Sequence, residues 1–349
     1  MNQTVNGEHS EVAVAPVPES LAGRYDGFIV DADGVLYRGH RVVDHARAAL
    51  AWVTQQADRP WGVVTNNAAH TPQEVAERLH NMGFEFQADH VITSSQGAAA
   101  YLQQRGVESG AEVLVVGGLG IETALQAAGF HPTRKRTADL AAVVQGFGPD
   151  LRWADLAEAS YAIEGGALWV ATNADLTLPT AEGLAPGNGS LVGAVVNAVG
   201  RTPDAVTGKP APLLMNLAAE RWGLEHPLVI GDRLDTDIAG GIRAGMDTLL
   251  VLTGVTGKRE LIDLVDAPDQ ERPRYLARDL RALLEPAHAS EIVGSGSVGS
   301  VGSVGPVNLV EHIRVELARA WTAAPGSAGD QVRSHSAARV AQLAQELFA

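Results

Sequence analysis

Two aspartates, Asp31 and Asp33, follow the short apolar run FIV and are followed at once by Gly34. In an extended chain, residues two positions apart point to the same side, so the two carboxylates should lie close together. Neighbouring carboxylates without partners raise each other's pKa, so this pair indicates a bound cation, a shared proton or a phosphate site. The alternative is an ordinary solvated turn, because Asp and Gly are common turn residues.

Three more places in the chain carry polar residues where a strand is expected to end or a helix to begin. Thr65 and Asn66 end the run WGVVTN, Asp232 and Asp237 follow the run PLVIG, and Lys209 stands in VTGKP. Ligands of doubly wound sheets bind at the carboxyl ends of the strands, so these groups should converge with the aspartate pair. Clustered carboxylates favour a hard cation such as Mg²⁺, which keeps a phosphate oxygen among its ligands. The pattern therefore predicts a magnesium-dependent phosphate site.

Short apolar runs rich in β-branched residues alternate with helical patterns along most of the chain. Eight runs have the composition of buried parallel strands: 25–31, 61–66, 90–94, 112–118, 142–147, 168–173, 227–232 and 248–254. The clearest helix follows Thr71, with Pro72 at its first position and Glu74 completing a capping box, and it ends at Gly83. This alternation predicts an α/β fold with a doubly wound parallel sheet and right-handed crossovers.

Composition limits the partners and the location of the protein. The chain has 349 residues, no cysteine and a net charge of −15. This acidic balance argues against a nucleic-acid partner, which would require a basic face. No run of about 18 uncharged apolar residues is present, so no membrane span is expected. Residues 1–20 lack the basic start and apolar core of a signal peptide and should form a flexible N-terminus, which favours a cytoplasmic location.

Four motifs together resemble those of the haloacid dehalogenase (HAD) superfamily of phosphatases. They are DADGV at 31–35, VVTNN at 63–67, GKP at 208–210 and GDRLDTDI at 231–238, in the order that the family has them. Two further segments, NADLTLP at 173–179 and PGNGS at 186–190, narrow the resemblance. They point to the subgroup of p-nitrophenylphosphatases, phosphoglycolate phosphatases, pyridoxal phosphatases and glycerol-3-phosphate phosphatases. The resemblance implies a Rossmann-like HAD core and a phosphoric monoester hydrolase.

The resemblance also implies a role for each motif residue. Asp31 would be the nucleophile that forms an aspartyl-phosphate, and Asp33 would be the general acid and base. The metal ligands would be Asp31, the backbone carbonyl of Asp33 and Asp232, with Asp237 acting through water. The phosphoryl oxygens would be held by Thr65, by Lys209 and by the N–H groups of Gly34 and Asn66.

A long insertion separates the second motif from the third. About 140 residues with their own strand–helix alternation lie between Thr65 and Lys209, too many for a loop in a compact domain. They predict an inserted α/β cap at 98–205, which by resemblance supplies specificity, with Asn173, Asp175 and Pro179 as candidates. Because a cap excludes bulky substrates, we expect a small phosphorylated metabolite. Glycerol 3-phosphate and 2-phosphoglycolate are favoured, with pyridoxal phosphate and other sugar or nucleotide phosphates as alternatives.

The remaining segments complete a predicted domain plan. The core would be discontinuous, formed by 21–97 and 206–285, followed by a Gly/Ser/Val-rich linker at 286–307 and a helical tail at 308–349. The tail has an apolar stripe at helical spacing, made by Leu309, Ile313, Leu317 and Trp321. This stripe could dock on its own core, pair with a second chain in a homo-oligomer or bind another protein.

Two other functional classes stay open on the sequence alone. A phosphorylatable signalling domain also places clustered aspartates, a threonine and a lysine on a parallel sheet, although the inserted cap and the DADG motif argue against it. The chain could also be an interaction module whose tail is the functional part and whose core only resembles an enzyme. Steady turnover of a phosphate ester would separate the first class from an enzyme, and deletion of the tail would test the second.

Overall fold

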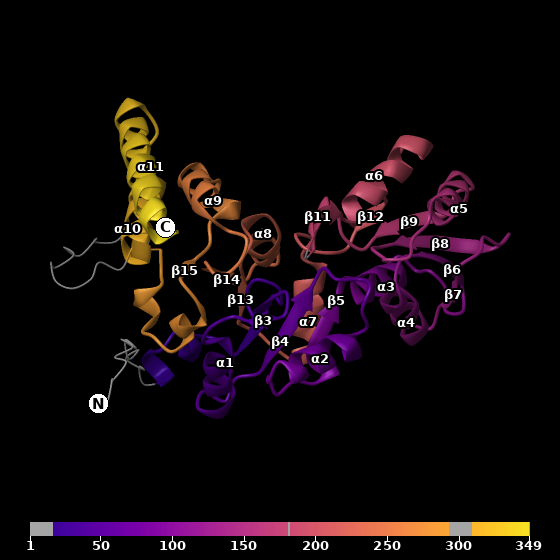
Figure 1. The fold of residues 1–349 in the computed structure, drawn as a ribbon, viewed down its shortest axis with the longest axis horizontal. Helices are drawn as coiled ribbons and strands as arrows, with labels where there is room; N and C mark the ends of the chain where they lie inside the picture. The colour runs from indigo at the N-terminus through magenta and orange to yellow at the C-terminus, as the bar shows by residue number, and fades with distance from the viewer. Residues whose placement is uncertain (1–16, 181, 293–308, 349) are drawn as a thin grey trace, which may run out of the picture.

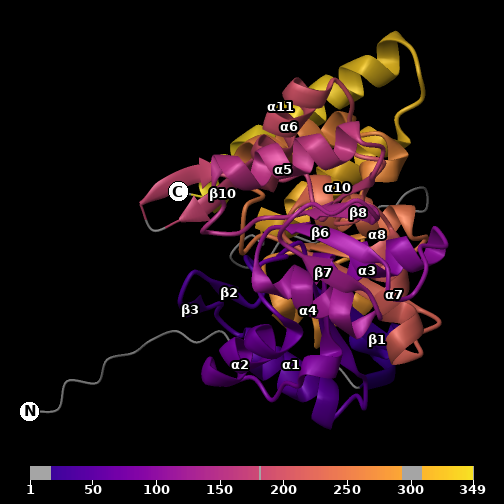
Figure 2. The ribbon, with the colours of Figure 1, turned by 90° about the vertical axis from the view of Figure 1, so that its right-hand side faces the viewer.

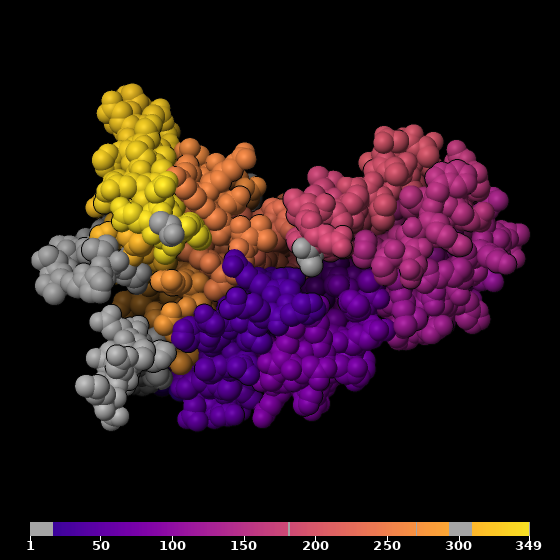
Figure 3. Space-filling view, in the orientation of Figure 1, coloured from indigo at the N-terminus to yellow at the C-terminus, as the bar shows by residue number. Residues whose placement is uncertain are grey.

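Two parallel sheets dominate the computed structural model, which describes residues 17–180, 182–292 and 309–348 (Figure 1). The core sheet has the strand order β15-β14-β13-β1-β4-β5, and the cap sheet has the order β12-β9-β8-β6-β7. The two sheets lie in separate lobes, with the cap on the right of Figure 1 and the core at its centre. The space-filling view shows the surface hollowed between the cap and the part of the core that carries α9 (Figure 3).

The core sheet is covered by helices on both faces. Its strands are β1 (Gly27–Val30), β4 (Trp61–Thr65), β5 (Val91–Thr93), β13 (Pro227–Gly231), β14 (Asp247–Val251) and β15 (Tyr275–Ala277), and its helices are α1 (Ala46–Gln55), α2 (Pro72–Asn81), α3 (Ser94–Gln104), α7 (Leu213–Trp222), α8 (Ala239–Arg243) and α9 (Lys258–Asp263). Phe28 and Val30 pack with α1 and α2, whereas Ile29 between them packs with α7 on the opposite face. Because both faces are buried, the strands are continuous apolar runs, as the sequence predicts.

Short 3₁₀ segments connect several of these elements. They are η1 (Val17–Glu19), η2 (Ala22–Arg24), η3 (Ala88–His90), η5 (Leu264–Asp266), η6 (Asp269–Glu271), η7 (Leu280–Leu283) and η8 (Ala287–Ala289). The predicted capping box of α2 is confirmed, because Thr71 Oγ1 accepts from Glu74 N at 3.2 Å and Glu74 Oε2 accepts from Thr71 N at 2.7 Å. Gly83 follows the helix with φ of +84°, a conformation that suits glycine.

The cap is a smaller α/β unit inserted between β5 and α7. Its strands are β6 (Glu112–Val116), β7 (His131–Thr133), β8 (Leu140–Gln145), β9 (Leu168–Ala171) and β12 (Ala205–Val206), and its helices are α4 (Leu119–Ala127), α5 (Trp153–Glu164) and α6 (Asn188–Val199). An antiparallel hairpin of β10 (Thr177–Thr180) and β11 (Gly183–Pro186) contacts α6 and projects from the cap (Figure 2). The predicted cap limits, 98 and 205, fall inside α3 and β12 respectively.

Each of the eight predicted strands is present, whereas several shorter strands were not predicted. The missed strands β7, β12 and β15 are edge strands of two or three residues, and β2 (Tyr37–Arg38) and β3 (Arg41–Val42) form a two-residue hairpin. So short a segment carries too few residues for a period of two to be recognised. The β10–β11 hairpin is also hard to predict, because it contains Pro179, Gly183 and Pro186, and proline and glycine disfavour strands.

The C-terminal tail is helical, as expected, and it docks on its own core. Helices α10 (Leu309–Thr322) and α11 (Ser327–Leu347) pack together, and α11 packs against α9 while α10 packs against η5 and β15. Ile313 and Leu317 are fully buried in one apolar cluster with Leu261 of α9, and Trp321 Nε1 donates to Leu264 O at 3.0 Å. Of the three fates considered for the apolar stripe, the structure therefore shows intramolecular docking.

The predicted flexible segments fall mainly outside the described residues. Residues 1–16 and 293–308 are not described, and they include most of the predicted N-terminus and linker. The described ends of both segments belong to the core: Ser20 is fully buried, and Ile292 N donates to Arg274 O at 2.9 Å. Within residues 17–180, 182–292 and 309–348, no helix has both the length and the apolar character that a membrane crossing requires.

Candidate active site

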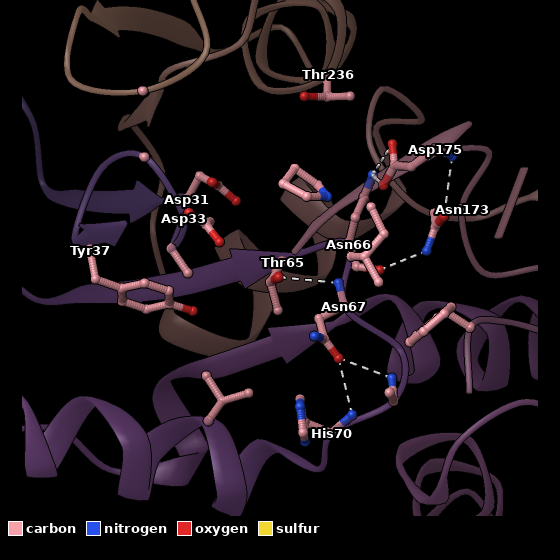
Figure 4. A pocket seen from close by; sticks show the side chains of 18 of the residues that line it. Asp31, Asp33, Tyr37, Thr65, Asn66, Asn67, His70, Asn173, Asp175 and Thr236 are labelled. Carbon is pink, nitrogen blue, oxygen red and sulfur yellow. Dashed lines mark hydrogen bonds between the residues drawn. The ribbon is translucent and has the colours of Figure 1, made fainter. Parts of the chain in front are cut away.

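The aspartates of the first and fourth motifs lie at the carboxyl edge of the core sheet. Strand β1 lies between β13 and β4, so Asp31 after β1, Asp232 after β13 and Thr65 at the end of β4 are neighbours in space. Asp31 and Thr65 are labelled at this edge in Figure 4. The ladder continues one residue past β1, where Asp31 N donates to Ile230 O at 2.9 Å. The predicted convergence follows from this strand order, because parallel strands end at the same edge.

Lys209 supplies a buried positive charge between two of these carboxylates. Its side chain is almost fully buried, and Nζ lies 2.5 Å from Asp31 Oδ1 and 2.7 Å from Asp237 Oδ1. Nζ also donates to Val64 O at 2.9 Å, so two carboxylates and one backbone carbonyl surround the ammonium group. Burial alone would lower the pKa of Lys209, but the ion pairs with Asp237 and Asp31 outweigh burial and raise it. Lys209 therefore stays charged at neutral pH.

Three carboxylates form a site that fits a hard divalent cation. Asp31, Asp232 and Asp237 each contribute an oxygen, and these oxygens lie within 4.8 Å of one another. Burial, together with the neighbouring carboxylates, raises the pKa of Asp31 to about 8 and that of Asp232 to about 6. One lysine cannot neutralise three carboxylates, so negative charge is left over when all three ionise. Oxygen ligands with surplus negative charge suit Mg²⁺.

The backbone around Asp232 leaves room for its carboxylate and holds it in place. Val255 N donates to Asp232 Oδ2 at 2.5 Å, and Thr256 Oγ1 donates to Asp232 O at 2.6 Å. A Cβ atom on Gly34 would lie 2.4 Å from Asp232 Oδ2, and one on Gly254 only 1.8 Å away. Both glycines are therefore required by the close approach of backbone and carboxylate, and Gly34 also has a φ of +85°.

Asp237 lies on a wide turn, η4 (Leu234–Ile238), that has π-helical hydrogen bonding. Its Oδ2 accepts from Arg233 N at 3.2 Å, which points the other oxygen at Lys209. Asp235 is on the same turn, but its carboxylate accepts two hydrogen bonds from the Arg233 guanidinium, at 3.0 and 2.7 Å. Asp235 is therefore paired with Arg233, and the helix that follows has no side-chain cap.

Asp33 differs from Asp31 in its surroundings. Its side chain is exposed to the cavity beside Asp31 (Figure 4). Partial burial raises its pKa, and the positive charge of Arg78 opposes that rise. The next residue, Gly34, donates its N–H to Tyr37 O at 2.7 Å. That N–H has a protein acceptor, so this geometry does not favour its predicted role as a donor to phosphate.

Both halves of the core match known family models. Residues 28–131 match the family described as haloacid dehalogenase-like hydrolase, and residues 206–283 match the related HAD-hydrolase-like family. D-glycerol 3-phosphate phosphatase of Mycobacterium tuberculosis is 43% identical over 76% of this chain and 72% of the relative. Acid sugar phosphatase of Staphylococcus saprophyticus is 35% identical over 75% of this chain and 97% of the relative.

Solved structures give the same result for the fold. The glycerol phosphate phosphatase of Mycobacterium tuberculosis in complex with magnesium superposes with a TM-score of 0.79 and 36% identity, over 90% of this chain and 98% of that one. The p-nitrophenyl phosphatase of Archaeoglobus fulgidus superposes with a TM-score of 0.67 and 27% identity, over 74% and 98%. The chain belongs to the haloacid dehalogenase-like hydrolases. It is an HAD-type phosphoric monoester hydrolase.

The active site of this HAD hydrolase opens into a cavity of about 990 Å³ between core and cap. The cavity is lined by Asp31, Asp33, Thr65, Asn66, Lys209, Asp232 and Asp237 from the core and by Asn173, Asp175 and Pro179 from the cap. The structure therefore brings the predicted site residues to one place. Their individual roles are not tested by this arrangement and stay predictions.

Several cavity residues of this HAD hydrolase were not found from the sequence. They are charged or titratable side chains of the β2–β3 hairpin, of α2 with the loop before it, and of the fourth motif: Arg38, His40, His70, Glu74, Arg78 and Arg233. Arg78 lies over the Tyr37 ring at 4.4 Å and donates to Gly39 O at 2.7 Å, which ties α2 to the hairpin. Only Arg233 stands inside a motif, and nothing in the spacing of the others marks them.

Proposed function

We propose that this chain hydrolyses a small phosphorylated metabolite in a Mg²⁺-dependent reaction, with glycerol 3-phosphate as the favoured substrate. The observation that carries the proposal is the cluster of Asp31, Asp232 and Asp237 around Lys209, directly beneath the cavity between core and cap. This arrangement combines a nucleophile, fixed positive charge and oxygen ligands at one point, which phosphoryl transfer requires.

Asp31 is the proposed nucleophile. Its carboxylate attacks phosphorus, and the bond from phosphorus to the ester oxygen breaks as an aspartyl-phosphate forms. Lys209 lies 2.5 Å from the Asp31 carboxylate, and its charge opposes, without cancelling, the rise in the pKa of Asp31 that burial causes. The same ammonium group lies close enough to offset charge on the phosphoryl oxygens, and Thr65 offers a hydroxyl from the neighbouring strand end (Figure 4).

Asp33 is the proposed acid and base. Its raised pKa favours the protonated form more than in a free aspartate, which suits a group that gives a proton to the departing alkoxide. The resulting carboxylate then takes a proton from a water molecule, and that water attacks phosphorus and releases Asp31 and inorganic phosphate. The different surroundings of Asp31 and Asp33 explain how two adjacent aspartates take opposite roles, one beside an ammonium group and one exposed to the cavity.

Asp31, Asp232 and Asp237 are the side chains that would hold Mg²⁺, either directly or through water. When bound there, Mg²⁺ offsets the surplus negative charge of the site and of the phosphate group. Val255 N and Arg233 N, which hydrogen-bond Asp232 and Asp237, keep both carboxylates oriented without the ion. The site is therefore organised by the backbone before metal binding, which limits the reorganisation that catalysis would need.

Substrate choice rests on the relatives and on the cavity. The relative of 43% identity is named for D-glycerol 3-phosphate, which favours that substrate over 2-phosphoglycolate. A second candidate, a sugar phosphate, is supported by the cavity volume of about 990 Å³, which exceeds what glycerol phosphate fills. The acid sugar phosphatase of Staphylococcus saprophyticus, 35% identical, supports the same candidate.

The test is a panel of phosphate esters compared by kcat/KM with and without Mg²⁺. It includes glycerol 3-phosphate, 2-phosphoglycolate, pyridoxal phosphate, several sugar phosphates and p-nitrophenyl phosphate. We expect steady turnover that requires Mg²⁺ and the highest kcat/KM for glycerol 3-phosphate. A single round of labelling without turnover would instead indicate a phosphorylatable signalling protein and would overturn the proposal.

A further inference from the structure

Asn66 lies where the cap meets the core, and its side chain makes contacts to both. Its Oδ1 accepts from Lys209 N at 2.7 Å, and its Nδ2 donates to Lys209 O at 3.1 Å, so one amide group holds both polar backbone groups of the lysine. The same Nδ2 donates to Asp175 Oδ2 of the cap at 3.2 Å (Figure 4). A Cβ atom on Gly208 would lie 2.7 Å from Asn66 Oδ1, so glycine is needed beside this contact.

Two cap residues, Asn173 and Asp175, contact Asn66. Asn173 Nδ2 donates to Asn66 O at 2.8 Å, while Asn173 Oδ1 accepts from Asp175 N at 3.2 Å. That turn directs the Asp175 carboxylate to the Asn66 side chain (Figure 4). The first residue of α6, Asn188, donates from Nδ2 to Asn173 O at 2.7 Å and is itself fully buried. The α6 terminus thus fixes the segment that reaches the core.

A continuous path of hydrogen bonds therefore runs from the cap to the nucleophile. It passes from Asp175 to Asn66, from Asn66 to the backbone of Lys209, and from Lys209 Nζ to Asp31. Lys209 must hold its ammonium group between two carboxylates, so a shift of its backbone would move the charge away from the reacting phosphorus. Misplacement of this kind lowers kcat even when substrate binding is preserved.

We propose that Asn66 and Asp175 form a latch between core and cap that positions Lys209 when the cap lies over the site. Both are positioning residues, because neither needs to touch the substrate to act. This proposal rests on the proposed phosphatase function. It assigns Asp175 to the positioning of Lys209 and not to the recognition of substrate hydroxyls. A specificity residue would affect polyol phosphates alone, whereas the latch affects every phosphate ester alike.

The decisive experiment reverses the polarity of the contact. N66D brings a second carboxylate against Asp175 and removes the donor to Lys209 O, so kcat on p-nitrophenyl phosphate should fall by about tenfold or more. D175N alone keeps an acceptor for Asn66, so kcat should fall less than in N66D. In N66D/D175N the new amide donates to the new carboxylate, and kcat should recover at least about threefold over N66D.

A charge-matched control distinguishes restoration of the contact between residues 66 and 175 from a change in the net charge of the cap. Asp150 is an exposed cap residue, so N66D/D150N removes one cap charge without restoring the latch and should show no recovery. Purely additive effects of N66D and D175N would overturn the proposal. So would a D175A variant whose defect is confined to KM for glycerol 3-phosphate, because Asp175 would then read the substrate.

Amide hydrogen exchange gives a readout that does not depend on turnover. The Lys209 N–H donates to Asn66 Oδ1 and makes no contact with Asp175 itself. D175A should nevertheless speed exchange of the peptide that contains Lys209, because it frees the Asn66 side chain. Unchanged exchange there would overturn the latch. Failure of the wild type to hydrolyse any ester would overturn the proposed function and leave this measurement valid.

Discussion

The two parallel sheets of this protein differ in what stands at their carboxyl edges. In the core, Asp31 and Asp232 follow adjacent strands, and a buried lysine pairs with Asp31 and Asp237. In the cap, Gly146 and Thr172 follow the adjacent strands β8 and β9, and a Cβ on Gly146 would lie 2.6 Å from Thr172 Oγ1. The same architecture therefore supports a charged crevice at one sheet and a closely packed neutral edge at the other. The chemistry depends on the residues at the strand ends and not on the fold.

Neutral amide side chains at the carboxyl edge of the cap sheet are suited to holding the cap segment around Asn173 in position. Trp169 Nε1 donates to Gln145 Oε1 at 3.2 Å, and Asn188 donates to the backbone of Asn173, all in buried surroundings. Such groups keep the cap segment in place without adding charge that would compete for a cation. If this division is correct, substitutions at the core edge abolish chemistry, and those elsewhere change positioning or stability.

The largest effect is expected for the nucleophile. Asp31→Asn removes the attacking carboxylate, so kcat should fall by more than about a thousandfold while the fold is retained. Turnover of p-nitrophenyl phosphate measures the loss, and circular dichroism checks the fold. Asp150→Asn, an exposed change of the same type in the cap, should keep the wild-type rate. Near-normal turnover of Asp31→Asn would show that another group attacks phosphorus.

The metal site gives the next largest effect. Asp232→Asn removes one carboxylate of the trio, so the Mg²⁺ concentration that gives half-maximal activity should rise by more than about tenfold. EDTA should abolish wild-type turnover, and excess Mg²⁺ should restore it. The matched control is Asp235→Asn, because Asp235 lies on the adjacent turn but pairs with Arg233. An equal effect of both variants would argue for a general loss of negative charge and against a defined ligand.

The sequence carried enough information for the charged edge of the core and less for its connection to the cap. Asp31, Lys209 and Asp232 were predictable because they follow apolar runs whose parallel order brings their ends together. The contact of Asn66 with Asp175 was not predictable, because residues 109 positions apart meet only after both sheets have formed. Nothing in their local sequence marks a hydrogen bond of that kind.

The pH dependence of the stability of the protein should report on the carboxylates at the charged edge of the core sheet. The pKa of Asp31 is raised to about 8 and that of Asp232 to about 6. In the unfolded chain both pKa values are about 4. Between about pH 4 and these raised values, the folded protein therefore holds more protons than the unfolded chain. Stability without metal should therefore fall as pH rises through this window. Mg²⁺ must displace the same protons, so its affinity should rise with pH.

Thermal denaturation with and without Mg²⁺ measures this linkage. The increase in melting temperature that saturating Mg²⁺ causes should be larger near pH 8 than in mildly acidic buffer. Asp232→Asn should reduce the increase at both pH values. A Mg²⁺ effect that does not change with pH would indicate that binding releases no protons and would contradict the raised pKa values.

The smallest effect on chemistry is expected in the tail, although the tail bears on stability. Leu317 of α10 is fully buried in the apolar cluster between the tail and the core, whereas Val332 of α11 is 42% exposed. Leu317→Ala should lower the free energy of unfolding by about 2–5 kcal/mol because it leaves a cavity. Val332→Ala, the matched control, should change it by no more than about 0.5 kcal/mol.

Both tail variants should keep the wild-type kcat at temperatures where they are folded. The reason is that the tail packs on α9, η5 and β15, whereas Asp232 is held by Val255 and Thr256. Since these two residues bond Asp232 through the backbone and a hydroxyl group, a small cavity under the tail should not move the carboxylate. A folded Leu317→Ala variant that needs more Mg²⁺, as Asp232→Asn does, would show that the tail positions the metal site and that chemistry is not confined to the core edge.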